Sequence, residues 1–106
     1  MKILYDHEGR AIRLTEERLA HILEHPEMAG MEAAIEETLA HPERVVQSFS
    51  DPQAHLYYRY YLRTIVGRKY LCTVVKVSET DAFVLTAYLT DRIKRGETLW
   101  PANPSG

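Results

Sequence analysis

The sequence contains a single cysteine among its 106 residues, Cys72. One cysteine excludes an internal disulfide framework and is typical of a protein from the reducing cytoplasm. Cys72 stands in an apolar stretch, which favours a small buried side chain over a nucleophile. The sequence also lacks a signal-peptide pattern and any apolar run long enough to cross a bilayer. We therefore expect a cytoplasmic protein that does not associate with membranes.

Neither sign of charge is in strong excess, since 13 Lys and Arg oppose 15 Asp and Glu for a net charge of −2. A basic field over the whole molecule, as many nucleic-acid-binding proteins have, is therefore absent. The charges are nevertheless segregated. Eight acidic residues lie between Glu16 and Glu43, whereas five cations and no acid lie between Arg59 and Lys76. Any site for a polyanion must be a local patch in the second half of the chain.

Several catalytic motifs are missing. The sequence has no Gly-rich phosphate loop, no Gly-x-Ser-x-Gly, no Cys-x-x-Cys and no acidic pair in a strand context. This argues against nucleotide hydrolysis, serine hydrolysis, thiol redox chemistry and two-metal or glycosidase mechanisms. His21 and His25 are four residues apart, a spacing that can chelate zinc on a helix, but no third ligand is evident. We expect neither a metal nor another cofactor.

The hydrophobic pattern predicts an α+β fold with a small N-terminal hairpin and two α-helices packed on one face of a four-stranded antiparallel sheet. A single domain over 1–100 and a flexible tail over 101–106 are expected, and residues 91–96 resemble a short helix that ends at Gly96. The expected elements are hairpin strands at 2–5 and 11–14, helices at 16–25 and 31–40, and strands at 44–49, 54–66, 69–77 and 82–89.

The run from His55 to Arg63 alternates in a way that assigns its two faces. On a strand, successive side chains point to opposite faces of the sheet. We expect the set Leu56, Tyr58, Tyr60 and Leu62 to face the core, because it is the more apolar one. The other set interleaves cations with aromatic rings, which suits phosphates and stacked bases. Extending the alternation to the next two strands predicts one free sheet face that carries Tyr57, Arg59, Tyr61, Lys76, Thr86, Tyr88 and Thr90.

The chemistry that such a face supports is metal-free cleavage of RNA. RNA carries its own nucleophile, the 2′-hydroxyl, so an enzyme needs a proton carrier, a cation for the phosphorane and hydroxyl donors. Histidine is the natural proton carrier near neutral pH. The predicted catalytic residues are His21 as general acid or base, Arg59 and Lys76 as phosphate and transition-state stabilisers, and Thr86 and Tyr88 as hydroxyl donors. The predicted substrate-binding residues are His25, Tyr57, Tyr61, Arg63 and Thr90.

Several short motifs in a fixed order resemble the phage-associated branch of the barnase–EndoU–colicin E5/D–RelE-like nuclease superfamily. They are Leu14-Thr15-Glu16-Glu17-Arg18, His21-Ile22-Leu23, His25-Pro26-Glu27, Ser50-Asp51-Pro52, Leu56-Tyr57-Tyr58-Arg59, Val74-Val75-Lys76-Val77 and Thr86-Ala87-Tyr88-Leu89-Thr90-Asp91. The resemblance covers nearly the whole chain. It implies two helices on a four-stranded sheet and metal-independent RNA cleavage by residues of the first helix and the sheet face. A net negative charge departs from the strongly basic ribosome-directed members.

Three hypotheses follow. The first is an endoribonuclease, acting as the toxin beside a cognate antitoxin or immunity protein. The second is a catalytically inactive module of the same fold that binds RNA or a protein. The third is a partner protein or homodimer that associates through its acidic helices.

Overall fold

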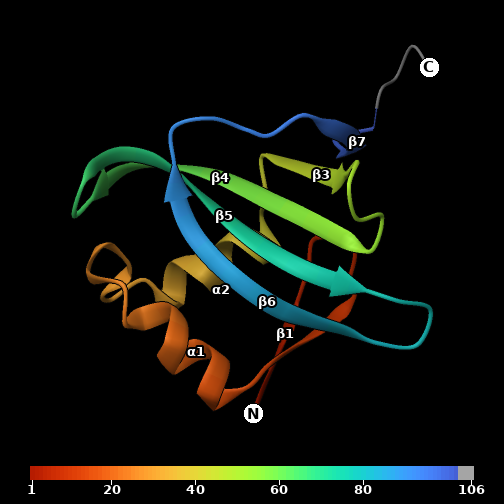
Figure 1. The fold of residues 1–106 in the computed structure, drawn as a ribbon, viewed down its shortest axis with the longest axis horizontal. Coiled ribbons are helices and arrows are strands. Elements are labelled where there is room, and N and C mark those ends of the chain that lie inside the picture. Colours follow the sequence, from red (N-terminus) through yellow and green to blue (C-terminus); the bar gives the residue numbers. More distant parts are fainter. Residues whose placement is uncertain (103–106) are drawn as a thin grey trace.

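The computed structural model describes residues 1–102, and Figure 1 shows their fold. Two helices and one 3-10 turn lie beneath a long, curved sheet. The elements in chain order are β1 (Lys2–Tyr5), β2 (Ala11–Leu14), α1 (Glu16–Leu23), η1 (Pro26–Met28), α2 (Glu32–Ala40), β3 (Arg44–Ser48), β4 (Ala54–Thr64), β5 (Gly67–Val77), β6 (Ala82–Thr90) and β7 (Gly96–Trp100).

Local sequence accounts for the helical layer. Thr15 caps α1 by accepting a hydrogen bond from the backbone N–H of Arg18 at 3.1 Å, and acidic residues occupy the first turn. Ile22 of α1 and Ile35 and Leu39 of α2 are buried. Both helices therefore pack their apolar stripes against the sheet, as the sequence predicted.

The predicted four-stranded antiparallel sheet is wrong, although the fold is α+β. The structure has one mixed sheet of seven strands in the order β1-β2-β6-β5-β4-β3-β7. The N-terminal hairpin joins this sheet because β2 pairs in parallel with β6, with Arg13 opposite Phe83. Local pattern predicted the hairpin correctly, but this pairing links residues about 70 positions apart, which local pattern does not encode.

The C-terminal segment also differs from the prediction, because residues 96–100 form β7 in place of the end of a short helix. This strand pairs with β3 at the sheet edge, with Gly96 opposite Ser48. A Cβ atom on Gly96 would collide with the backbone oxygen of Gln47 and with a methyl group of Val46. Glycine at this position permits the close approach of the two strands, and does not end a helix. Of the predicted tail at 101–106, residues 103–106 lie outside the described part of the chain.

The sheet separates two hydrophobic clusters. The larger one lies between the sheet and the helices and includes Leu71 and Val75. The smaller one lies on the opposite side of the sheet, called here the outer face, and includes Leu56, Tyr58 and Cys72. Both sides of the central strands are thus partly covered, so the more apolar set of a strand does not reveal which side faces the helices.

This second cluster overturns the predicted faces. Tyr57 and Arg59 lie on the helix side, because they pair with Thr73 and Leu71. Tyr61 is also on the helix side, where it packs against the larger cluster. The other predicted residues lie on the outer face, because their partners across the strands belong to the smaller cluster or border it. These residues are Lys76, Thr86, Tyr88 and Thr90.

None of the helices in residues 1–102 has the length and apolar character needed to span a membrane.

Candidate functional site

A connecting segment crosses the outer face. Residues 91–95, called here the strap, run from the end of β6 to the start of β7 over the intervening strands (Figure 1). The backbone N–H of Lys94 donates to the Tyr58 hydroxyl at 3.1 Å, and Ile93 packs on the smaller cluster. The strap is therefore held at a fixed place, and the Lys94 and Arg95 side chains remain exposed.

Beside the strap lies an open groove of about 290 Å³. Leu56 and Val74 contribute its apolar floor, Lys94 and Arg95 its cations, and two strands and a turn its hydroxyl groups. The hydroxyl-bearing residues are Ser48, Ser50, Thr86 and Tyr88. Cations and hydroxyl donors are groups that contact phosphates in nucleic-acid-binding proteins, and apolar or aromatic surfaces contact bases.

Lys76 borders this groove through an ion pair with Asp51, one of the lining residues. The hydrogen bond from Lys76 lowers the pKa of the Asp51 carboxyl, so this group stays ionised near neutral pH. Because the pair neutralises both charges, the free cations of the groove are those of the strap.

Weak acids that keep their protons lie at the groove and next to it, since Tyr88 lines the groove and Tyr58 and Cys72 belong to the smaller cluster. Burial raises the pKa of the Cys72 thiol to about 11, and burial likewise raises the pKa of the Tyr88 and Tyr58 hydroxyls well above the ordinary value of 10. At neutral pH these groups can donate or accept hydrogen bonds but cannot act as general bases. The prediction that Cys72 is a buried side chain is confirmed.

Beyond the strap, toward the β4–β5 hairpin, two phenol rings meet on the outer face. Tyr60 and Tyr70 are in edge contact with ring centroids 4.9 Å apart, and Tyr60 is 38% exposed. Lys69 pairs with Asp91 at 2.5 Å beside them. Tyr60 is thus an exposed aromatic surface, where the sequence predicted a core residue.

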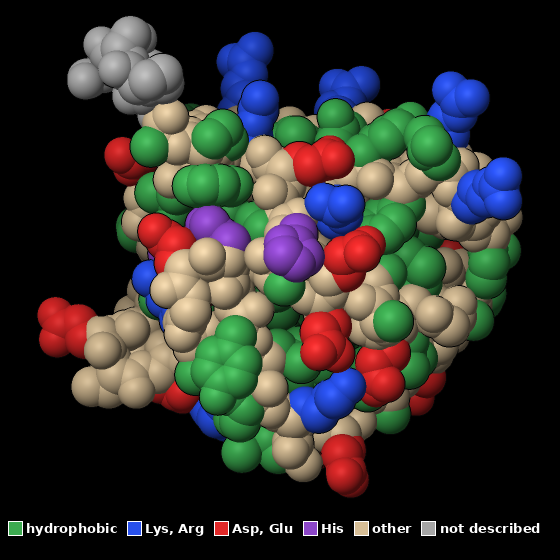
Figure 2. Space-filling model, turned by 180° about the vertical axis from the view of Figure 1, so that it is seen from behind, with side chains coloured by type: hydrophobic (Ala, Val, Ile, Leu, Met, Phe, Trp, Pro, Cys, Tyr) green, Lys and Arg blue, Asp and Glu red, His purple; other side chains and the backbone are tan. Residues whose placement is uncertain are grey.

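Lysine and arginine side chains are concentrated on one part of the molecular surface. Figure 2 shows lysine and arginine side chains projecting along one edge of the molecule, the upper edge in that view, whereas acidic side chains lie mainly in the centre and lower part. Figure 1 shows the strap along the upper edge and the β4–β5 hairpin at one end of the sheet, beside the start of the strap. The chain is acidic overall and yet presents a basic edge.

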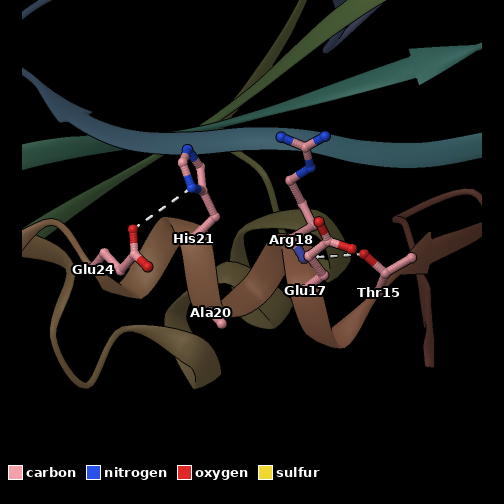
Figure 3. Close-up of a pocket in the computed structure, with 6 residues that line it drawn as sticks. All are labelled: Thr15, Glu17, Arg18, Ala20, His21 and Glu24. Atoms are coloured by element: carbon pink, nitrogen blue, oxygen red, sulfur yellow. Dashed lines mark hydrogen bonds and ion pairs between the residues drawn. The ribbon is translucent and has the colours of Figure 1, made fainter.

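His21 does not reach the outer face, because α1 lies on the other side of the sheet. Its side chain projects from the same side of α1 as Arg18, next to an open hollow, with Nδ1 3.6 Å from a carboxylate oxygen of Glu24 (Figure 3). His25 is its neighbour, with ring centroids 6.4 Å apart. Within residues 1–102, no hydrogen bond or ion pair joins any two of His21, Arg59, Lys76, Thr86 and Tyr88.

Arg59 and Tyr61 fasten β4 to α2. The guanidinium of Arg59 donates to the carbonyl oxygen of His41 at 2.8 Å and lies 3.4 Å from the Glu37 carboxylate. The Tyr61 hydroxyl lies 2.8 Å from the same carboxylate, and burial raises its pKa to about 12. Through these contacts, both residues attach β4 to the C-terminal part of α2 and so have a structural role. Arg63 is exposed near the hairpin tip, away from them.

A second polar cavity, missed by the sequence reasoning, lies near β7 on the helix side. Its volume is about 260 Å³, and His7, Arg10, His55 and Tyr57 are among its lining residues. The Tyr57 hydroxyl donates to a buried carboxylate oxygen of Asp6 at 2.7 Å. Burial is the main cause that lowers the pKa of His55, and the positive charge of Arg10 lowers it further. His55 is therefore mainly neutral at pH 7.

No local sequence pattern links these residues, because the N-terminal turn meets β4 only through the folded sheet. The strap cations were visible in the sequence as the basic run Arg92 to Arg95, but their place over the outer face depends on β7 pairing with β3. A Gly in a β-type stretch, at Gly96, was the available hint of that strand.

No known protein family, curated protein or solved structure matches this chain. In the part of the chain that the structure describes, no group of three or more His, Cys, Asp or Glu is arranged to hold a metal ion.

Proposed function

We propose that this protein binds single-stranded RNA on its outer sheet face. The observation that carries the proposal is the groove beside the strap, where Lys94 and Arg95 stand over an apolar floor and the hydroxyls of Thr86 and Tyr88. Cations track a phosphate backbone, while exposed phenol rings such as Tyr60 stack on bases without selecting a sequence. The superfamily resemblance, which implies an RNA substrate, points the same way.

Binding is favoured over cleavage at this groove because of its acid–base groups. Among the described residues that line it, none is a histidine. The pKa of Asp51 is lowered by Lys76, and the pKa of Tyr88 is raised by burial. A carboxylate that is a weak base and a phenol that is a weak acid contribute little to proton transfer near pH 7.

The test is RNA affinity as a function of salt. Fluorescence anisotropy with a labelled unstructured RNA measures the binding constant. We expect the logarithm of this constant to fall linearly with the logarithm of the salt concentration. Lys94→Glu or Arg95→Glu should weaken binding by about tenfold at low salt and reduce the slope by about 0.7 for each lost phosphate contact.

Arg18→Glu makes the same charge change on α1, on the opposite side of the sheet, and is the matched control. Its affinity and salt slope should stay close to those of the wild type. Equal losses in Arg18→Glu and Lys94→Glu would show that only net charge matters and would contradict a site on the outer face.

RNA cleavage is the second candidate function, and the cavity near β7 is the observation that favours it. Two imidazoles, a guanidinium and a phenol line this cavity, from His7, His55, Arg10 and Tyr57. These are the groups that metal-free cleavage by the 2′-hydroxyl requires. Incubation with total RNA and EDTA should then give products that His55→Gln abolishes. If His21→Ala abolishes them and His55→Gln does not, the original assignment of His21 is the better one.

Three further predictions from the sequence remain proposals: a cytoplasmic location, a cognate antitoxin or immunity protein, and a homodimer. A protein inhibitor that covers the outer face would compete with RNA, so it should lose affinity in Lys94→Glu. A homodimer through the acidic helices should be lost on charge reversal at Glu36 and Glu37, both exposed on α2.

A further inference from the structure

The tip of the β4–β5 hairpin is apolar. Leu62, Ile65 and Val66 expose 68%, 65% and 50% of their surfaces. Turns in soluble proteins usually carry Gly, Asn, Asp or Ser, and the exposure of aliphatic side chains costs free energy. Figure 1 shows the hairpin at one end of the sheet, and these exposed fractions mean that the rest of the described chain leaves the three side chains largely uncovered. Clustered exposed aliphatic side chains of this kind are typical of interaction surfaces.

Hydrogen bonds within the turn support the conformation of the tip. The Thr64 hydroxyl donates to the carbonyl oxygen of Gly67 at 2.5 Å and accepts from the backbone N–H of Val66 at 3.2 Å. Gly67 has a φ of 90°, a conformation that other residues rarely adopt, so it closes the turn. A preformed tip pays little ordering entropy when it binds.

Charge and position indicate what the tip contacts. Arg63 and Arg68 are exposed on either side of it, and the neighbouring acid Asp91 is paired with Lys69. The exposed Tyr60 lies between the tip and the strap along β4, so the apolar tip continues the surface on which we place RNA. Cations favour a polyanion in general, but continuity with this aromatic surface favours nucleic acid over lipid or an acidic protein.

We infer that the tip packs as an apolar wedge against the terminal base pair of an RNA duplex whose single-stranded extension lies on the outer face. Apolar side chains inserted between base steps are a known way for proteins to contact the faces of base pairs in DNA, and arginines commonly bind the phosphates. The preferred ligand is then a junction of double-stranded and single-stranded RNA. This inference rests on the proposed RNA binding and adds the class of RNA.

The experiment compares two labelled RNAs, a stem-loop with a single-stranded extension of about six nucleotides and the extension alone, within the usual size of single-strand sites. Wild type is expected to bind the junction about tenfold more tightly than the extension. Ile65→Ser/Val66→Asn should abolish this preference and leave affinity for the extension unchanged. Both new residues are common in turns, and thermal melting verifies folding.

Ile3→Ser is the control and should keep the preference, because Ile3 is 42% exposed on β1, an edge strand that is separated from β5 by β2 and β6. Binding of both RNAs with equal affinity, or a preference that survives in the tip variant, overturns the wedge while RNA binding stands. Absence of binding to either RNA overturns the proposed function together with the wedge. Co-sedimentation with anionic phospholipid vesicles that the tip variant alone loses would assign the tip to a lipid surface and also overturn the wedge.

Discussion

Tyr57→Phe should destabilise the protein more than the loss of one ordinary hydrogen bond would. The Tyr57 hydroxyl is the donor to Oδ2 of Asp6 at 2.7 Å, and the Asp6 side chain is fully buried. Oδ1 of Asp6 is satisfied separately by the backbone N–H groups of Glu8 and Arg10. Removal of the hydroxyl leaves a buried carboxylate oxygen whose nearest cation is Arg10 at 3.7 Å.

A hydrogen bond to a charged group contributes about 1.5–3 kcal/mol, and here its loss leaves the acceptor desolvated. Unfolding entropy of about 2.1 cal/mol/K per residue corresponds to roughly 0.2 kcal/mol/K for a chain of this size, so the melting temperature should fall by about 7–13 °C. Differential scanning fluorimetry and urea unfolding measure the two quantities.

Tyr70→Phe is the matched control, because the Tyr70 hydroxyl has no hydrogen-bond partner among residues 1–102. Its effect should stay within about 0.5 kcal/mol. If Tyr57→Phe melts at the same temperature as the Tyr70→Phe control, the bond to Asp6 does not tie the N-terminal turn to the sheet, and the reasoning is refuted.

Other consequences can be measured separately. Gly96→Ala should destabilise the pairing of β7 with β3, since its Cβ meets the backbone of Gln47, and faster amide hydrogen exchange in β7 would report this. Tyr58→Phe leaves the N–H of Lys94 without its acceptor and should cost about 1 kcal/mol and weaken RNA binding through a looser strap. The pKa of His55 is lowered in the folded state, so its contribution to stability is present above pH 6.5 and lost as the pH falls through the folded pKa. Between pH 7 and pH 5, the free energy of unfolding measured with urea should thus fall more for the wild type than for His55→Gln. Cys72, with a pKa of about 11, should resist iodoacetamide at pH 8 until the protein is unfolded.

Short-range features of this protein were predictable from sequence. The Thr15 cap, the apolar stripes of α1 and α2 and the strands flanking Gly9 and Gly67 depend on neighbouring residues, and these helices and strands were found close to their predicted places. The basic segment from Arg59 to Lys76 did not in the same way predict the cations of the groove. Arg59 and Lys76 pair with acids, and the free cations, Lys94 and Arg95, come from the strap.

The faces of the sheet were not predictable, and with them the composition of the site. Alternation along β4 separates Tyr58 from Tyr57 but does not say which of them faces the helices, because both are buried. Interpreting the more apolar set as the helix side placed Arg59 beside Lys76, whereas Arg59 bonds to the end of α2 and Lys76 pairs with Asp51 on the other side.

By itself, then, the sequence determined the α+β composition, the helix ends, the hairpins and the position of the basic segment along the chain, since each depends on contacts within a few residues. Only the tertiary structure decided that β2 pairs with β6, that β7 closes onto β3 and that the strap lies across the outer face. Those pairings join residues that are far apart in the sequence, and packing over the entire sheet decides which of the alternative pairings forms. They bring Lys94 and Arg95 above Thr86 and Tyr88, and so create the groove on which the proposed function depends.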